Sequence, residues 1–390
     1  MVGTIPETND RLYRWIVGQP RALSAIQTLA NGKRPEQPCW VEIHCAGLEG
    51  CWNRCRHCTG QIPWSLERPC VIPLSGLKRC LDAIKFLGIP MVVLSGNRTE
   101  PLLHPDFDAL MDAVRARGLA TGLHTSGLQL TSRRASRLTS DAVEGDNVAF
   151  SIDSFNNETY EISHRAGPRC CQRPFDSVVE NARCLAAGKS RPEDPPFITW
   201  KYLWLNGNLD QAGVECFVRL AKESGANRVR FAAPLPPVHE AGRLRGFRQI
   251  SEEEFWMATD WAEKAKQVVG ETATFTVEIV RVPPLTDHAE PRFSRCWHAE
   301  LMAVVGRDGL IYPCTSVASP LFEHLAYGTC ADLAKAWEDR PPIRVPEDCS
   351  GLYCDRFERF VNEWIEEHLA IYQMTSSKHT AVWAIHAGTA

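Results

Sequence analysis

Three cysteines lie within eight residues of this chain, Cys51, Cys55 and Cys58, with C-x3-C-x2-C spacing. A loop of this length can bring three thiolates to one inorganic cluster, and it leaves the fourth corner of a four-iron cubane without a protein ligand. Clusters that only carry electrons are normally held by four cysteines, so an open corner indicates chemistry at the cluster. A structural zinc loop is the alternative, because C-x2-C with further cysteines is also a zinc pattern.

A second group of cysteines follows near the C-terminus. Its members are Cys296, Cys314, Cys330, Cys349 and Cys354. Between the first two, residues 301–305 and 310–312 flank Asp308 and Gly309. Asp-Gly tolerates the backbone of a tight turn, so the segment predicts a hairpin that brings Cys296 and Cys314 together at its open end. A structural zinc site is again the alternative.

The composition is typical of a globular intracellular protein. With 390 residues, of which 44% are hydrophobic, the chain exceeds one ordinary core. Its charge of -4 is interspersed, without the basic stripe that nucleic-acid binding needs. It has no long apolar run and no signal-peptide pattern. We therefore expect a cytoplasmic protein without nucleic-acid or membrane partners, whose sixteen cysteines serve metal rather than a disulfide framework.

Short apolar segments alternate with amphipathic ones along the first 235 residues. Segments with apolar residues at i, i+3, i+4 and i+7 predict helices that include Leu77, Phe107, Phe175 and Val214. The alternation predicts a parallel sheet with helices on its outer face, and ligands gather at the carboxyl ends of such strands. Runs rich in β-branched and aromatic residues predict the strands, at residues 40–44, 91–94, 148–152, 197–205 and 229–233.

The first cysteine group follows the predicted strand at residues 40–44 and resembles the radical S-adenosylmethionine (SAM) superfamily. In that family the open iron binds the amino and carboxylate groups of SAM, and one electron from the cluster cleaves SAM to methionine and a 5'-deoxyadenosyl radical. The resemblance covers about residues 39–235. It implies a [4Fe-4S] cluster, SAM, and an α/β fold of the (β/α)6 partial TIM barrel type.

Three further segments resemble SAM-binding motifs of this family. Residues 95–106 look like its S-G-G-E-P-L-L-H-P-D turn, with two residues inserted and the second glycine missing. There the resemblance assigns the SAM amino group to Gly96 and Glu100, since an ammonium suits a carboxylate. Ser151 and Asp153 match polar groups near the ribose and carboxylate of SAM, and His57 matches a ring beside the adenine. Ordinary loop contacts, strand-end capping and packing are the alternatives.

The second cysteine group resembles the SPASM/twitch extension of the same family, a cap with auxiliary iron-sulfur clusters. The spacing of Cys296, Gly309 and Cys314 matches its first half, and residues 326–337 resemble its continuation. Five cysteines are too few for the two clusters of a complete SPASM extension. The resemblance therefore implies a small α+β twitch-like iron-sulfur domain with one auxiliary [4Fe-4S] cluster. Its expected ligands are Cys296, Cys314, Cys349 and Cys354, with Cys330 as a spare or substitute.

These features predict five parts along the chain. They are an N-terminal helical extension (1–38), the radical SAM partial barrel (39–235), a connecting segment (236–290), the twitch-like auxiliary cluster domain (291–362) and a C-terminal tail (363–390).

The resemblance implies an enzyme that abstracts a hydrogen atom from an unactivated C–H bond. If an auxiliary cluster accepts an electron from the substrate, the enzyme is an oxidoreductase that forms a double bond or a crosslink. Otherwise an epimerase is possible, and Cys170 or Cys171 could donate the returning hydrogen because an S–H bond is weak. Flavodoxin or ferredoxin is the expected reductant.

Peptide-modifying members commonly carry a separate leader-binding domain, whereas only residues 1–38 precede the first predicted strand. We therefore expect a small-molecule substrate of the sugar, aminocyclitol or nucleoside type, in natural-product biosynthesis. Maturation of a ribosomal peptide, by crosslinks or epimerised residues, is the alternative. The alternative of another class is an iron-sulfur electron carrier, which would need neither the Glu100 turn nor a barrel.

Overall fold

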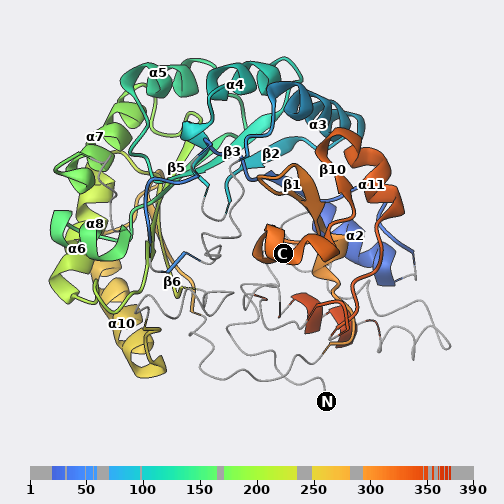
Figure 1. Ribbon diagram of the computed structural model, residues 1–390. Coiled ribbons are helices and arrows are strands. Elements are labelled where there is room, and N and C mark those ends of the chain that lie inside the picture. The colour runs from blue at the N-terminus through green and yellow to red at the C-terminus, as the bar shows by residue number, and fades with distance from the viewer. Residues whose placement is uncertain are drawn as a thin grey trace.

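A curved sheet of ten strands forms the centre of the molecule (Figure 1). This computed structural model describes residues 20–30, 33–48, 50–55, 57–58, 70–96, 99–164, 171–234, 248–281, 293–345, 347–349, 354, 359, 361–363, 365–367 and 369. Seven of the strands are parallel and lie side by side in chain order. They are β1 (Trp40–Ile43), β2 (Met91–Leu94), β3 (Ala120–Thr125), β4 (Asn147–Ser151), β5 (Phe197–Leu203), β6 (Arg228–Ala232) and β7 (Thr276–Ile279).

Helices connect these strands and lie along the convex outer side of the sheet in Figure 1, as parallel crossovers require. They are α3 (Leu74–Phe86), α4 (Phe107–Arg115), α5 (Ser132–Ser140), α6 (Asn157–His164), α7 (Pro174–Ala187), α8 (Gln211–Glu223) and α10 (Glu252–Val269). Helix α2 (Pro20–Ala30) precedes the sheet and α11 (Leu333–Asp339) follows it. Short 3-10 helices occupy Pro101–Leu103, His298–Glu300, Thr315–Val317, Pro320–Leu325 and Cys330–Asp332.

The two faces of the sheet differ in chemistry. Successive side chains of a strand point to opposite faces. On β5, Trp200 and Tyr202 are fully buried and belong to the apolar core shared with the outer helices. Lys201 between them therefore faces the concave side, as Arg230 does between Val229 and Phe231 on β6. The outer face stabilises the barrel by apolar burial, while the concave face carries charge.

The predicted C-terminal hairpin is confirmed. Strands β8 (Met302–Val305) and β9 (Leu310–Tyr312) are antiparallel, and Gly309 has φ of 80° in the turn between them. Strand β10 (Gly328–Thr329) pairs with β9. However, β8 also pairs in parallel with β1, with Val41 opposite Ala303. The hairpin thus continues the barrel sheet, and the expected separate twitch-like domain is not confirmed.

The α/β class and the parallel partial barrel are confirmed. The five predicted strands occur within one or two residues of their expected bounds. The connecting segment adds α10 and a seventh parallel strand, β7. In the part of the chain that the structure describes, no helix is both long and apolar enough to cross a membrane.

Candidate functional site

The first cysteine group lies in the loop that leaves the carboxyl end of β1. Cys51, Cys55 and Cys58 are each half-buried. Burial raises the pKa of Cys55 well above its usual value, and the charges of Cys51, Cys58 and Asp153 raise it further. Three thiolates this close repel one another unless a cationic group neutralises them. The donor set therefore fits a bound metal cluster.

The cysteine loop is fastened to α6. The backbone N–H of Arg54 donates to the carbonyl of His164 over 2.9 Å, and the Asn53 amide donates to the Tyr160 hydroxyl over 3.3 Å. The rings of His57 and His164 meet edge to face with centroids 5.8 Å apart. The loop is thus held from one side by a helix that sequence analysis does not single out.

Asp153 completes this attachment just beyond the end of β4. It is 1% exposed, and its φ of 49° is the one positive value among the described non-glycine residues. One carboxylate oxygen accepts a 2.7 Å hydrogen bond from the Leu203 N–H. The other lies 3.4 Å from Nε2 of His57 and 3.6 Å from Nε2 of His164. Asp153 therefore links the barrel to the histidine between Cys55 and Cys58.

Electrostatics favour a charged Asp153 beside a neutral His164. Burial works against the charge, but contacts with His57, His164 and the Leu203 N–H hold the pKa of Asp153 below its usual value. Burial lowers the pKa of His164 to about 4. The structure therefore brings His57 and Asp153 together. Their SAM-binding role, and that of Ser151 at the end of β4, stay predictions.

The Glu100 turn follows β2 at the same edge of the sheet. The Glu100 carboxylate is 2% exposed and accepts hydrogen bonds from the Thr125 hydroxyl (2.6 Å), the Leu102 N–H (3.3 Å) and both the N–H and hydroxyl of Ser126 (2.8 and 2.7 Å). Burial nevertheless raises its pKa. Glu100 thus fixes this turn to the end of β3, and its contact with the SAM amino group remains a prediction.

Gly96 in this turn is required by a close approach. Its φ is 132°, and an added Cβ would lie 2.4 Å from Cγ of His44. Such a position excludes other residues because of both backbone strain and collision. The turn therefore packs directly on the end of β1.

Glu42 joins that end of β1 to the second cysteine region. Its Oε1 accepts from Nε2 of His44 (2.9 Å) and the hydroxyl of Ser95 (2.6 Å), and its Oε2 accepts from Thr315 (2.9 Å), the residue after Cys314. Burial opposes the charge, yet the hydrogen bonds from His44 and Ser95 hold the pKa of Glu42 below its usual value. Sequence analysis missed the pair of Glu42 and His44. The available signal was two polar residues at positions i and i+2 at the end of a buried strand.

The expected ligands of the second site lie in or against one small apolar cluster. Cys296 and Cys314 are buried members of it. Cys349 and Cys354 pack against it, together with Phe322. Two buried and two half-buried thiols in apolar surroundings are a donor set that suits a closed iron-sulfur cluster.

Cys330 lies elsewhere. It belongs to the main barrel core, close enough to Cys80 on α3 for its charge to raise the pKa of that thiol. Of the two proposed hydrogen donors, Cys171 is exposed and lies 3.0 Å from the Ser177 hydroxyl. Cys170 lies outside the described residues.

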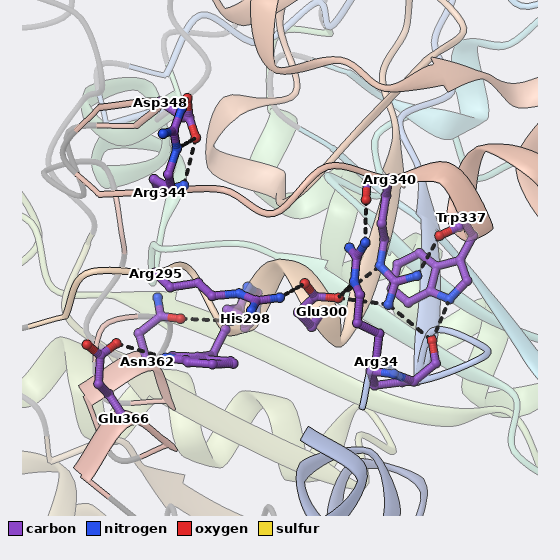
Figure 2. A network of polar contacts seen from close by, with 12 residues as sticks. Arg34, Arg295, His298, Glu300, Trp337, Arg340, Arg344, Asp348, Asn362 and Glu366 are labelled. Carbon is purple, nitrogen blue, oxygen red and sulfur yellow. Dashed lines mark hydrogen bonds and ion pairs between the residues drawn. The ribbon is translucent and has the colours of Figure 1, made fainter. Parts of the chain in front are cut away.

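A buried ion network supports the second cysteine region (Figure 2). Glu300 is 2% exposed and receives Arg295 on one oxygen (2.6 Å), with Arg34 (3.1 Å) and Arg340 (2.7 Å) on the other. Arg340 also stacks on Trp337, 3.6 Å from its ring centroid. Arg295 precedes Cys296, so this Glu300 network fixes the start of the region.

Comparisons with known proteins agree with this geometry. The chain is 26% identical over 290 residues to the PqqA peptide cyclase of Ruegeria pomeroyi, which covers 71% of this chain and 70% of that protein. The fold is similar to SuiB of Streptococcus suis bound to S-adenosylmethionine (14% identity, 83% and 70% coverage, TM-score 0.59). It is also similar to anSMEcpe with bound AdoMet (14% identity, 86% and 97% coverage, TM-score 0.55). No family model matches the chain.

The expected small-molecule substrate is wrong. The curated relative is a peptide cyclase. Similar folds include SuiB bound to its precursor peptide SuiA and anSMEcpe with bound Kp18Cys peptide. The peptide alternative is therefore favoured.

Two of these similar structures hold S-adenosylmethionine, the cofactor that the sequence resemblance implies. The cysteine spacing, the parallel partial barrel and the sequence relationship point to one conclusion. In cysteine spacing, fold and sequence, the chain is similar to enzymes of the radical S-adenosylmethionine superfamily.

Proposed function

We propose that this enzyme oxidatively crosslinks residues of a peptide. The observation that carries the proposal is the three-cysteine loop, held against α6 at the carboxyl edge of the sheet, in a chain related in sequence to a peptide cyclase. Crosslinking is preferred to epimerisation because four further cysteines lie in or against one apolar cluster, surroundings suited to an electron-transfer centre.

Cys51, Cys55 and Cys58 would hold a [4Fe-4S] cluster with one open iron. When bound with SAM, that cluster supplies the one-electron chemistry that cleaves SAM and allows hydrogen abstraction from an unactivated C–H bond. A second cluster would supply a site for moving electrons. Its proposed ligands are Cys296, Cys314, Cys349 and Cys354; the place of Cys330 in the barrel core favours leaving it out of the set.

The chain's own residues position these groups. Asp153 orients His57, and with it the loop between Cys55 and Cys58. The Glu100 turn follows β2 and Ser151 ends β4, two strands further along the same edge of the sheet, where we place SAM. Preorganised contacts of this kind reduce the cost of holding reactants in a productive geometry.

Crosslinking joins two substrate atoms at the expense of one hydrogen on each, so it is a two-electron oxidation. It therefore needs an electron acceptor besides SAM, and the second cysteine site supports this requirement. Flavodoxin or ferredoxin remains the proposed class of reductant for the first site. Epimerisation, with Cys170 or Cys171 as hydrogen donor, would conserve the mass of the peptide.

The test is an anaerobic reaction of the iron-reconstituted full chain with SAM, dithionite and peptides encoded beside its gene. We expect 5'-deoxyadenosine and a peptide lighter by two hydrogen atoms. A peptide whose mass is unchanged in ordinary water but which gains one deuterium in heavy water would replace crosslinking by epimerisation. Absence of 5'-deoxyadenosine would overturn the whole assignment. Cys55→Ala provides the inactive control.

A further inference from the structure

A surplus of positive charge lies on the concave face of β5 and β6. Lys201, Arg228 and Arg230 all lie on this face, between buried apolar residues that point to the helices. Both arginines approach the same carboxylate, Glu278 on β7, at 3.2 and 3.5 Å. Among the described residues, one carboxylate thus lies at ion-pair distance from this group of three cations, while Glu42 and Asp153 lie farther away, so a further negative group would improve the charge balance.

Lys201 is the least neutralised member of this group. Within the described ranges, no carboxylate lies at ion-pair distance from its ammonium, and Nδ1 of His124 lies 3.4 Å from it. Burial lowers the pKa of Lys201 to about 8, with Arg230 contributing, while the more distant Glu42 and Asp153 oppose the shift. Burial also lowers the pKa of His124, which leaves it neutral and able to accept from Lys201.

The two arginines are accessible from the concave side. The side chains of Arg230 and Arg228 are 44% and 37% exposed. In the register of the sheet, Lys201 lies between Arg230 and the short side chain of Ser151, the last residue of β4. The positive group therefore borders the strand end where we place SAM.

We propose that Lys201 and Arg230 form a subsite that binds an acidic side chain of the peptide substrate. A carboxylate there would accept charge-assisted hydrogen bonds from an ammonium and a guanidinium. The peptide class rests on the proposed function, while the acidic side chain rests on the charges of β5 to β7. The carboxylate of SAM is the competing source of the same chemistry.

The experiment measures binding of two pentapeptides to the reconstituted full chain with SAM present. The probes are acetyl-Gly-Gly-Glu-Gly-Gly-amide and its counterpart with Gln in place of Glu. We expect the Glu peptide to bind about tenfold tighter, a margin typical of one charge-assisted contact. Arg230→Gln and Lys201→Met should each remove most of the margin. Lys264→Met, on the exposed side of α10, is the matched control and should retain it.

Arg230→Gln keeps the test decisive if Lys201→Met does not fold, because the arginine side chain is exposed. Equal or undetectable binding of the two peptides would overturn the subsite, as would a margin that survives both substitutions. Variants that lose SAM affinity instead would assign the carboxylate to SAM. Each of these outcomes can occur with normal SAM cleavage by the wild type, whereas failure of the proposed function would remove that cleavage.

Discussion

The two cysteine groups lie in opposite kinds of surroundings. The first is held by polar contacts from Asp153, His57 and helix α6, at the edge of a charged concave face. The second is enclosed by an apolar cluster that contains Cys296 and Cys314. The same ligand type can thus serve two purposes, because the groups around a metal centre control its access and its redox behaviour.

The two regions are nevertheless connected through one side chain. Glu42 accepts a hydrogen bond from Thr315, next to Cys314, and another from Ser95 at the start of the Glu100 turn. Strand β8 is also hydrogen-bonded to β1. The second region is therefore built onto the barrel edge that carries the first.

The largest expected effect comes from removing either cysteine group. Replacing Cys51, Cys55 and Cys58 with Ala should abolish 5'-deoxyadenosine formation, while the double variant Cys314→Ala/Cys349→Ala should retain it. Iron per chain should fall by about half in each, as expected when one of two four-iron clusters is lost. Anaerobic iron analysis and chromatography of the SAM products measure both quantities.

SAM cleavage by the triple variant would mean that the first loop is not the catalytic site. Full iron content in Cys314→Ala/Cys349→Ala would remove these residues from the ligand set. If that variant still makes the crosslinked peptide, the second site does not take part in the oxidation.

Glu300→Gln should have the next largest effect, and it acts on the second region alone. The substitution leaves Arg34, Arg295 and Arg340 beside an uncharged group, and breaking a buried ion pair costs about 3–5 kcal/mol. The free energy of unfolding of the variant, from urea titration of the reconstituted chain, checks the value. Glu363→Gln, on a half-buried pair with Arg359, is the matched control and should lose less than about 1 kcal/mol.

The same group predicts a pH dependence. Burial opposes ionisation, but the three arginines hold the pKa of Glu300 below its usual 4.5. Its contribution to stability is therefore complete above about pH 4.5 and is lost as the pH falls through the lower folded-state pKa. The stability difference between wild type and Glu300→Gln should shrink below pH 4.5. A difference that stays constant down to pH 3 would exclude this ionic origin.

Asp153 gives a smaller effect on the first region. Asp153→Asn removes the charge beside His57 and His164 and should lower the free energy of unfolding by about 1–3 kcal/mol. Asp153→Ala should lower it by about 1 kcal/mol more, because Asn tolerates a positive φ better than Ala. Urea titration measures both variants.

Iron retention separates a positioning role from a merely structural one. We expect both Asp153 variants to lose iron from the first site faster than wild type during desalting. The control is Asn157→Ala, at the start of α6, whose side chain accepts a hydrogen bond from the Phe175 N–H of α7. This variant should behave as wild type. Retention of iron at the wild-type rate in both would show that the contact with His57 does not position the cysteine loop.

Much of the fold could be predicted because apolar periodicity encodes it. Buried β-branched and aromatic residues mark strands β2, β5 and β6 in the sequence. Asp308 and Gly309 mark the turn of the hairpin. Strand β3 was harder to recognise, since its sequence includes Gly122 and His124 on the concave face. The pairing of β8 with β1 joins residues some 260 positions apart, and such a contact leaves no local pattern.

The candidate site divides in the same way. Spacing along the chain sufficed to locate Cys51, Cys55 and Cys58, because the ligands are neighbours in sequence. The attachment through Tyr160 and His164 depends on where α6 ends in space, and sequence analysis missed it. The substrate prediction failed for a different reason: it relied on segment length, which carries no information about the concave face.

Among these variants, Cys330→Ala should have the smallest effect on iron content and stability. It tests directly which cysteines belong to the second group. The Cys330 thiol lies in the barrel core beside Cys80 and Gly76, away from the apolar cluster of the other four cysteines. Removing it should leave iron content and product formation at wild-type levels and lower the free energy of unfolding by only about 1 kcal/mol, the cost of one small buried group. Cys354→Ala is the matched comparison and should lose about half of the iron. If Cys330→Ala loses iron and Cys354→Ala does not, the two residues exchange roles, and the second site must then form against α3 rather than within the apolar cluster.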